Sequence, residues 1–252
     1  MKLERRHQIA DLIKAQKTVT NAELMERFGI SIETVRRDLD DLEQQGILRK
    51  VYGGAVANLV LPMEPEYSSR SQMYFQEKNA IAQTAAGLIQ PGDTVYLGVG
   101  TTVQAMVQYM KNIGPITVFT NALRTAVELS ENPECTVILP GGQLRSRELT
   151  LSGFPAEDNL RHFNVEKAFI GIGGITEEGI TDFHIGEAGL HRQLILNAKQ
   201  SIALADSSKL GVRAMNNVCT LDQIDLVITD SNAHKPAVKA LQQAGAKVIV
   251  AK

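Results

Sequence analysis

The sequence has little cysteine, no long apolar run and no excess of charge of either sign. Its two cysteines, Cys135 and Cys219, lie in or beside apolar segments without metal-ligand spacing, so we expect buried, reduced and inert thiols. No window approaches the roughly 18 uninterrupted apolar residues of a membrane span. The N-terminal stretch MKLERRHQIADLIKAQ has no long apolar segment between its charges, which excludes a secretory signal. These absences predict a soluble, cytoplasmic protein.

The near-absence of net charge bears on nucleic-acid binding. The chain of 252 residues carries a formal charge of −2; residues 1–57 hold ten Lys and Arg against nine Asp and Glu, and the remainder holds sixteen against nineteen. A net charge this small provides little general attraction to DNA, so any affinity for DNA has to come from individual side chains in suitable positions. With 44% hydrophobic and 21% charged residues, the composition excludes disordered and collagen-like chains. The length allows one large domain or two modest ones.

The N-terminal segment has the pattern of three short helices. Apolar residues recur at helical spacing between residues 3 and 16, and Thr20 with Glu23 has the capping-box spacing that begins a second helix. Gly29 suits the left-handed position that ends a helix, and Ser31 is a second N-cap candidate. The third helix would end at Gly46. Its buried face is expected to consist of four apolar residues: Ile32, Val35, Leu39 and Leu42.

Two short helices joined by a glycine turn are typical of a helix-turn-helix. If the apolar residues face inward, the polar residues near the start of the third helix face outward, where a recognition helix contacts base edges and phosphates. These residues are Glu33, Thr34, Arg36 and Arg37. Two short strands around a Gly53-Gly54 turn follow, and Arg49 and Lys50 would make this hairpin a basic wing. The pattern also allows a protein-docking module, in which the arginines are only a solvated helix face.

The remainder of the chain begins with a predicted linker and continues with alternating elements. Residues 58–76 hold two prolines and three serines without a clear period, which indicates a linker. Helices are expected at about residues 77–89, 101–111, 123–130, 186–198 and 234–244. Apolar strands are expected at TVYLGV, ITVFTN, CTVILPGG, KAFIGIGG, SIALAD, DLVITD and KVIVA. This alternation predicts a doubly wound, mostly parallel α/β sheet, which binds ligands at the carboxyl ends of its strands.

One strand end, GVGTT at residues 98–102, has the features of a phosphate site. Its glycines let the backbone approach an anion, and the following helix start and the threonines supply donors. A dinucleotide fingerprint would need a third glycine where Val103 stands, and no Gly-Lys-Ser/Thr of a P-loop occurs, so no nicotinamide cofactor is expected. A tight turn without a ligand is the alternative.

Other strand ends also carry small or polar residues, and a set of them around one sheet edge predicts a shared pocket. Lys209 offers a charge for a phosphate or sugar oxygen, and Asp206 offers a carboxylate for hydroxyls or a salt bridge to Lys209. Arg145 and Arg147 would either clamp an anion or be solvated. The strand ends concerned are Thr120-Asn121, Gly141-Gly142, Gly171–Gly174 and Asp206–Lys209.

The stretch from about Glu4 to Ala55, with ERRHQI, FGISIETVRRDLDDLEQQG and YGGA, closely resembles the winged helix-turn-helix of the DeoR family of bacterial transcriptional regulators. The resemblance places the DNA-reading helix at residues 31–44 and the helix-turn-helix at about residues 20–39. It implies DNA binding by the helix-turn-helix and the wing. The expected contact residues are Thr20, Ser31, Ile32, Glu33, Thr34, Arg36, Arg37, Arg49, Lys50, Tyr52, Gly53 and Gly54.

Residues 77–252 resemble the sensor domain of the same family, which is similar in fold to ribose-5-phosphate isomerases and related sugar-phosphate and CoA-handling enzymes. The matching elements are GTT, TN, PGG, DSSK and ITD. Many family members carry an acidic residue where Gly98 stands, so a sugar-hydroxyl contact is missing there or supplied elsewhere. The resemblance implies a phosphorylated sugar or related metabolite as ligand. Its expected contacts are Gly98, Val99, Gly100, Thr101, Thr102, Thr120, Asn121, Gly141, Gly142, Asp206 and Lys209.

Together, the residues and the resemblance predict a winged helix-turn-helix domain over residues 1–57, a linker over 58–76 and an α/β effector-sensing domain over 77–252. The expected function is repression of a carbohydrate-catabolic operon, relieved by a phosphorylated metabolite. The expected partners are operator DNA, that effector and further copies of the chain in a dimer or tetramer, without cofactor, metal or membrane. Symmetric oligomers reading repeated half-sites suit such a fold.

The alternative is a sugar-phosphate isomerase-like enzyme with an accessory domain. Such an enzyme needs a general base, and Glu187, with Asp182 and His184 nearby in sequence, is the nearest candidate. A glutamate that opens a helix is explained by the helix dipole alone, so no catalytic residue is expected.

Overall fold

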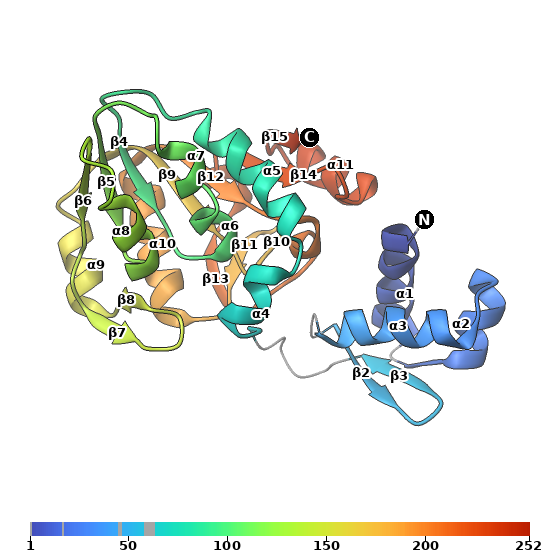
Figure 1. Cartoon of the computed structure of the whole chain (residues 1–252). Helices are drawn as coiled ribbons and strands as arrows, with labels where there is room; N and C mark the ends of the chain where they lie inside the picture. The colour runs from blue at the N-terminus through green and yellow to red at the C-terminus, as the bar shows by residue number, and fades with distance from the viewer. Residues whose placement is uncertain (1, 17, 45–46, 58–63) are drawn as a thin grey trace. The chain divides into compact units, whose positions relative to one another are not determined.

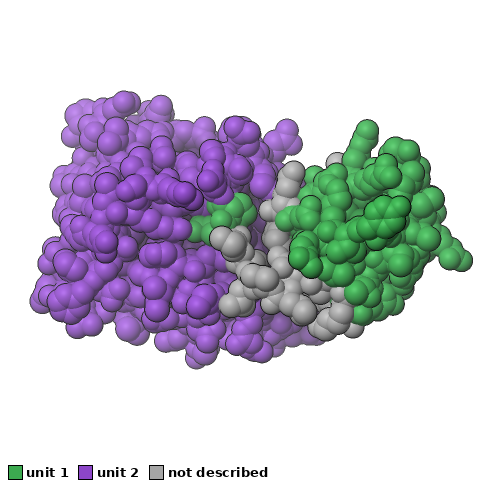
Figure 2. All heavy atoms as spheres, turned by 90° about the horizontal axis from the view of Figure 1, so that it is seen from below, with its two compact units in different colours: residues 1–65 green, residues 66–252 purple. Residues whose placement is uncertain are grey.

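The computed structural model describes residues 2–16, 18–44, 47–57 and 64–252 (Figure 1). The chain divides into two compact units, residues 1–65 and residues 66–252, which Figure 2 distinguishes by colour. Buried hydrophobic residues cluster within each unit, so each has a core of its own.

The first unit consists of helices and a small antiparallel sheet. Its elements are α1 (Lys2–Gln16), β1 (Thr18–Thr20), α2 (Asn21–Phe28), α3 (Ile32–Gln44), β2 (Leu48–Val51) and β3 (Gly54–Ala57). The strand order β1-β3-β2 places β3 in the middle. Ile13, Leu24 and Leu39, one from each helix, are buried together in the core. The predicted helices are confirmed, whereas β1 is an addition, since three residues are too few to show a period.

The boundaries of α2 follow from its local sequence. The Thr20 hydroxyl accepts a hydrogen bond from the Glu23 backbone N–H at 3.1 Å, and the Glu23 carboxylate accepts one from the Thr20 N–H at 3.5 Å. Gly29 ends the helix at φ +61°. The predicted capping box and glycine stop are therefore confirmed, and a cap of this kind contributes about 1 kcal/mol. The predicted end of α3 at Gly46 lies outside the described residues.

The hairpin turn differs from the prediction. Tyr52 and Gly53 form the turn, with Gly53 at φ +83°, while Gly54 is already the first residue of β3. A Cβ on Gly54 would lie 2.1 Å from the Val19 carbonyl oxygen. The second glycine is therefore required by the close pairing of β3 with β1 and not by the turn.

The second unit begins earlier than the sequence indicates. Residues 67–72 form helix α4 (Tyr67–Gln72), and α5 (Phe75–Ala86) starts at Phe75, so the predicted linker over 58–76 is wrong at its C-terminal end. Lys78 fixes the end of α4 and the residues that follow it, because its Nζ donates to the carbonyl oxygens of Arg70 and Met73, the latter at 2.7 Å. Residues 58–63 lie outside the described part of the chain.

The second unit is built around a seven-stranded sheet in the order β15-β14-β12-β9-β4-β5-β6, with every pairing parallel. Its strands are β4 (Thr94–Leu97), β5 (Ile116–Thr120), β6 (Cys135–Ile138), β9 (Val165–Gly171), β12 (Ala198–Leu204), β14 (Leu226–Asp230) and β15 (Val248–Ala251). Its further helices are α6 (Thr101–Gln104), α7 (Val107–Met110), α8 (Leu123–Leu129), α9 (Phe154–Leu160), α10 (Ile185–Asn197) and α11 (Lys235–Gln243).

Helices cover both faces of this sheet (Figure 1). Alternate residues of a strand point to opposite faces. Val95 and Leu97 of β4 pack in one core with α5, α6 and α7, whereas Tyr96 packs in another with α9 and α10. The predicted doubly wound parallel fold is therefore confirmed. The single helix predicted over 101–111 is divided into α6 and α7, because the Met106 N–H bonds to Val103, three residues back.

Short strands form two further sheets that the sequence analysis did not predict. They are the hairpin β7 (Gln143–Arg145) with β8 (Thr150–Ser152), and the antiparallel group β10 (Gly174–Thr176), β11 (Gly179–Asp182) and β13 (Asn216–Cys219). Each of these short segments holds only one or two apolar residues, in contrast to TVYL or VIVA of the main sheet, so no apolar pattern marks it as a strand.

Candidate functional site

Helix α3 presents two arginines to solvent. Arg36 and Arg37 are exposed, and neither forms a hydrogen bond or an ion pair with another described residue. The pKa of the neighbouring Glu33 carboxyl is lowered by a backbone hydrogen bond and the Ser31 side chain, and further by attraction to both arginines. The two guanidinium groups are thus free donors on the outward side of the second helix of a helix-turn-helix.

The other predicted contacts in the helix-turn-helix have structural roles as well. The Thr34 backbone N–H lies 3.4 Å from the Ser31 hydroxyl, and the Ser31 and Thr34 hydroxyl oxygens are 3.2 Å apart. Thr20 caps α2, and Ile32 is half-buried. These hydroxyl groups shape the turn and the start of α3, whereas no hydrogen bond or ion pair with another described residue occupies Arg36 or Arg37.

A buried carboxylate fixes α3 against α1. Asp38, whose side chain is 1% exposed, accepts from Arg5 Nε at 2.6 Å and from Arg6 Nε at 2.9 Å. Arg6 also pairs with Asp41. Two N-terminal arginines, whose charge alone would also suit a contact with DNA, therefore fix the orientation of α3 from its buried side.

The basic residues of the wing differ in their surroundings. The Lys50 ammonium pairs with Asp40 of α3, and the Lys50 backbone N–H donates to the Glu43 carboxylate at 2.6 Å. Arg49 is exposed. Lys50, predicted to face DNA, thus already joins β2 to α3, whereas Arg49 keeps its charge available.

Tyr52 is the most exposed large side chain of the wing, with a relative accessibility of 107%. It occupies the turn with Gly53, so the aromatic ring projects from the tip of the hairpin. An exposed aromatic side chain has no packing role in the folded unit, which is consistent with a contact to a partner.

In the second unit, the predicted phosphate loop at residues 98–102 joins β4 to α6. The Gly98 N–H donates to the Phe169 carbonyl at 2.8 Å, which extends the pairing of β4 with β9. Gly100 has φ +124° immediately before α6. A Cβ on Gly171 of β9 would lie 2.3 Å from the Val99 carbonyl oxygen. The loop therefore lies against the end of β9 with no space for a side chain between them.

Thr101 is half-buried and Thr102 is buried at the start of α6. Thr120 is the last residue of the neighbouring strand β5 and Asn121 follows it, but the polar atoms of both side chains form internal hydrogen bonds. The Thr120 hydroxyl accepts from the Ala122 N–H at 3.1 Å, and Asn121 donates to the Leu151 carbonyl at 3.0 Å and accepts from the Tyr96 hydroxyl. These two residues shape the wall beside the loop.

Gly141 and Gly142 follow the edge strand β6, and β5 lies between β6 and β4. A Cβ on Gly142 would lie 2.7 Å from the Ser152 carbonyl oxygen and 2.9 Å from the Ala156 Cβ. This Gly-Gly pair therefore packs against β8 and α9, and the structure does not place it on the strands that adjoin the phosphate loop.

Asp206 and Lys209 follow β12, which is separated from β4 by β9 alone. Asp206 accepts from the Ser208 N–H at 3.1 Å and lies 4.0 Å from Lys78 Nζ. Lys209 Nζ lies 5.8 Å from the centre of the Phe183 ring. Lys78, which was not among the predicted site residues, thus lies beside Asp206 just beyond the carboxyl end of β12. Burial lowers the Lys78 pKa to about 8.

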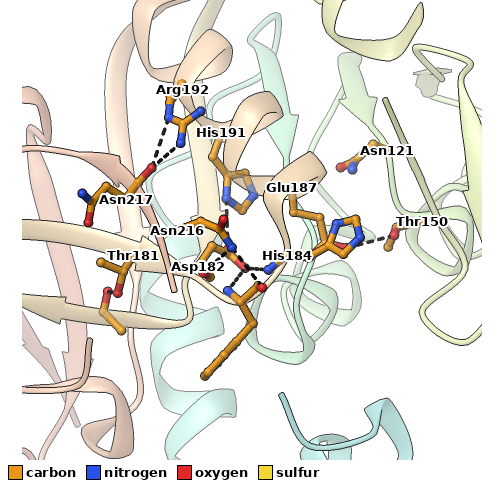
Figure 3. Close-up of polar contacts among 12 residues, drawn as sticks. Asn121, Thr150, Thr181, Asp182, His184, Glu187, His191, Arg192, Asn216 and Asn217 are labelled. Atoms are coloured by element: carbon orange, nitrogen blue, oxygen red, sulfur yellow. Dashed lines mark hydrogen bonds and ion pairs between the residues drawn. The ribbon is translucent and has the colours of Figure 1, made fainter. Parts of the chain in front are cut away.

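The candidate base and the candidate anion clamp contact each other. The buried Glu187 carboxylate accepts from Arg145 at 2.9 Å. It also accepts from the Thr150 hydroxyl at 3.1 Å (Figure 3). Arg147 is 88% exposed and lies 3.8 Å from an exposed Glu66. Arg145 therefore belongs to the packing of the β7–β8 hairpin on α10, and Arg147 is a solvated residue.

His191, one turn after Glu187, was not selected from the sequence. Its buried ring lies with Nδ1 at 3.4 Å from the Asp182 carboxylate (Figure 3). Burial raises the Asp182 pKa, but hydrogen bonds from His191 and from the backbone of His184 and Phe183 outweigh it and lower the pKa overall. The only sequence signal was the four-residue spacing between Glu187 and His191.

The two cysteines are free and half-buried, where full burial was predicted. Burial raises the pKa of both thiols, that of Cys219 to about 11, which favours the unreactive thiol form. Among the residues that the structure describes, no cluster of three or more His, Cys, Asp or Glu could hold a metal ion. In the same ranges, every helix is too short or too polar to cross a membrane.

Comparisons with known proteins cover almost the whole chain. The DeoR-like helix-turn-helix domain matches residues 5–59, and the DeoR C-terminal sensor domain matches residues 74–231. The HTH-type transcriptional repressor GlcR of Bacillus subtilis (strain 168) is 36% identical over 98% of this chain and 95% of its own. The glycerol-3-phosphate regulon repressor of Escherichia coli (strain K12) is 32% identical over 96% and 95%. A ribose 5-phosphate isomerase A from Methanocaldococcus jannaschii is similar over 54% of each chain, at 18% identity and a TM-score of 0.38.

Proposed function

The chain belongs to the DeoR family of transcriptional regulators, and on that premise we propose that it represses an operon for carbohydrate catabolism until a phosphorylated sugar or related metabolite binds its second unit. It is a DNA-binding regulator and not an enzyme. The observation that carries the proposal is the combination, in one chain, of a helix-turn-helix with unpaired arginines and a parallel sheet with a glycine loop at the carboxyl end of β4.

On the DNA side, Arg36 and Arg37 would read bases or phosphates in the major groove, as the outward residues of a recognition helix do. Arg49 and Tyr52 would contact the backbone or the adjacent groove from the wing. The first unit has almost no net charge, so these few side chains would supply most of the specific affinity. Thr20, Ser31 and Thr34 would support them by fixing the two helices.

On the effector side, the loop at residues 98–102 and Lys209 would hold the phosphate, and Asp206 would face the hydroxyl groups of the ligand. Thr120 and Asn121 would shape the surrounding wall, since their contacts are internal, whereas Gly141 and Gly142 follow the edge strand β6 and are left out of the site. The relatives named as repressors include one of a glycerol-3-phosphate regulon, which agrees with a phosphate monoester as the ligand class. A homo-oligomer that reads repeated half-sites is part of the proposal, and sedimentation of the protein with DNA tests it.

The central experiment measures the affinity of the protein for a DNA fragment that the wild-type protein selects from a random pool. The affinity is measured alone and with glycerol 3-phosphate, ribose 5-phosphate, fructose 6-phosphate and glucose 6-phosphate. At least one ester should weaken DNA binding, because allostery requires the ligand to favour the state that does not bind DNA. An unchanged affinity with every ester would refute the effector half of the proposal.

The DNA half has its own test. Arg36→Ala should weaken binding to the selected fragment by about 1–3 kcal/mol if Arg36 makes a bidentate base contact. Arg161→Ala is the matched control, because Arg161 is exposed at the end of α9 in the second unit. Equal affinities of both variants and the wild type would contradict the role of Arg36.

A further inference from the structure

A regulator of this kind needs a physical connection between its ligand site and the chain segment that leads to its DNA-binding unit. Helix α4 is the first element of the second unit, and it follows that segment directly. Among the described residues, Arg124 lies over the Tyr67 ring at the start of α4, and Arg70 joins the end of α4 to two other parts of the second unit.

The side chain of Arg70 forms one of these contacts. Its guanidinium pairs with Glu148, in the loop between β7 and β8, and both side chains are mostly buried, with 15% and 9% exposed. Three residues earlier along the same hairpin, Arg145 pairs with Glu187 of α10 at 2.9 Å. Two ion pairs on one short hairpin therefore join α4 to α10, whose buried face lies against the sheet that carries the candidate ligand site.

The backbone of Arg70 forms the other contact. Its carbonyl oxygen accepts from Lys78 Nζ, which also donates to the Met73 carbonyl at 2.7 Å and lies 4.0 Å from Asp206. Asp206 stands at the end of β12, beside the candidate phosphate site. At Arg70, α4 is thus joined to α10 by one line of contacts and to Asp206, a proposed ligand contact, by another.

We propose that Arg70 is a positioning residue that couples ligand binding in the second unit to DNA release, through the Glu148–Arg145–Glu187 line and through the Lys78–Asp206 line. This inference rests on the proposed function. Buried charges of this kind have few stable arrangements, because a displaced partner leaves an unpaired charge in a poorly solvated place. A ligand that draws Lys78 away from the Arg70 carbonyl, or shifts α10 and with it Glu187, therefore alters how firmly α4 is held, and the chain carries the change towards the first unit.

The test compares Arg70→Met and Glu148→Gln with Arg147→Met as the matched control, all in the full-length protein. Arg147 lies in the same hairpin loop, and its ion pair with Glu66, just before α4, joins two exposed side chains, 88% and 73% exposed, so its loss should leave α4 in place. The readout is the ratio of DNA affinities without and with whichever of the four phosphate esters acts on the wild type. A tenfold ratio in the wild type and in Arg147→Met should fall below about threefold in Arg70→Met and Glu148→Gln, and the double variant should be no worse than either single variant. The thermal shift that the ester produces should persist, because neither residue belongs to the proposed ligand contacts.

Amide hydrogen exchange of residues 67–72 provides a measurement that needs no ligand. Arg70→Met should speed exchange in α4, and so should Arg145→Met, which acts at the far end of the hairpin; Arg147→Met should not. A role confined to the local Arg70–Glu148 contact predicts no effect of Arg145→Met on α4, and that result overturns the inference. An Arg70→Met protein that responds to the ester like the wild type also overturns it. If no ester acts on the wild type, the proposed function fails, and the exchange of α4 alone decides on the coupling between hairpin and helix.

Discussion

Replacement of Asp38 by alanine tests how the recognition helix is held in place. The wild-type carboxylate is 1% exposed and accepts from Arg5 at 2.6 Å and from Arg6 at 2.9 Å. Removal of one partner of a buried ion pair typically costs about 3–5 kcal/mol, since charges remain without compensation. The arginine side chains keep 19% and 14% exposure and can turn towards water, so the lower end, about 3 kcal/mol, applies.

This loss is large compared with the stability of the unit. A unit of residues 1–65 is expected to have about 3–10 kcal/mol in total, at roughly 0.05–0.15 kcal/mol per residue. Its melting temperature should fall by about 12–24 °C, at roughly 4–8 °C per kcal/mol for a domain of this size. The second unit should keep its own transition, because Asp38 makes its contacts within the first unit.

Calorimetry of the full-length protein measures both transitions, and the affinity for the selected DNA fragment is measured in parallel. Asp40→Ala is the matched control: Asp40 lies on the same helix and pairs with Lys50, but its side chain is 48% exposed. A surface pair of this kind contributes about 0–1 kcal/mol. A loss below about 1 kcal/mol in Asp38→Ala, or equal losses in the two variants, would refute the reasoning that the buried clamp stabilises the first unit.

Three further predictions concern single positions. Gly171→Ala should cost about 1–3 kcal/mol because its Cβ would lie 2.3 Å from the Val99 carbonyl oxygen, whereas Gly87→Ala, with ordinary contacts at 3.5 Å, should be neutral in the same urea titration. Burial lowers the Lys78 pKa from 10.5 to about 8, so between these two pH values the unfolded chain binds more protons than the folded protein. The free energy of unfolding of the wild type, measured in urea, should therefore rise from about pH 8 to pH 10.5. The Lys78→Met variant should not show this rise. Tyr52→Ala should change the melting temperature little, because the ring is fully exposed, but should weaken binding to the selected DNA fragment; unchanged binding would remove Tyr52 from the DNA surface.

Features that depend on neighbouring residues were predictable from the sequence. The capping box of Thr20 and Glu23 and the stop at Gly29 involve at most four consecutive positions, and both are present. The alternation of apolar strands with amphipathic helices likewise predicted the parallel sheet, since each strand shows its pattern alone. The predicted end of the linker was wrong because Lys78 and Glu148 hold α4 in place, and the sequence around α4 gives no sign of these contacts.

Features that depend on partners far apart in sequence were not predictable. Asp38 is 33 positions from Arg5, and the two form one buried contact. Lys50 has the charge expected of a DNA contact, but its ammonium group forms an ion pair with Asp40, ten positions earlier in the chain. Residue type and exposure pattern therefore identify candidates for a site, and the folded surroundings decide which candidates keep a free functional group.

Glu187 and Arg145 show how one contact changes two interpretations at once. In sequence, Glu187 was the candidate for a general base and Arg145 a candidate anion clamp, and each was plausible alone. A general base has to reach the proton that it abstracts, and an anion clamp has to offer unpaired donors. The two groups lie 2.9 Å apart, with Thr150 as a further donor to the same carboxylate oxygen. Each group is the partner of the other, so the carboxylate at the start of α10 holds the β7–β8 hairpin in place, and neither of the two roles that the sequence suggested is needed to explain the pair.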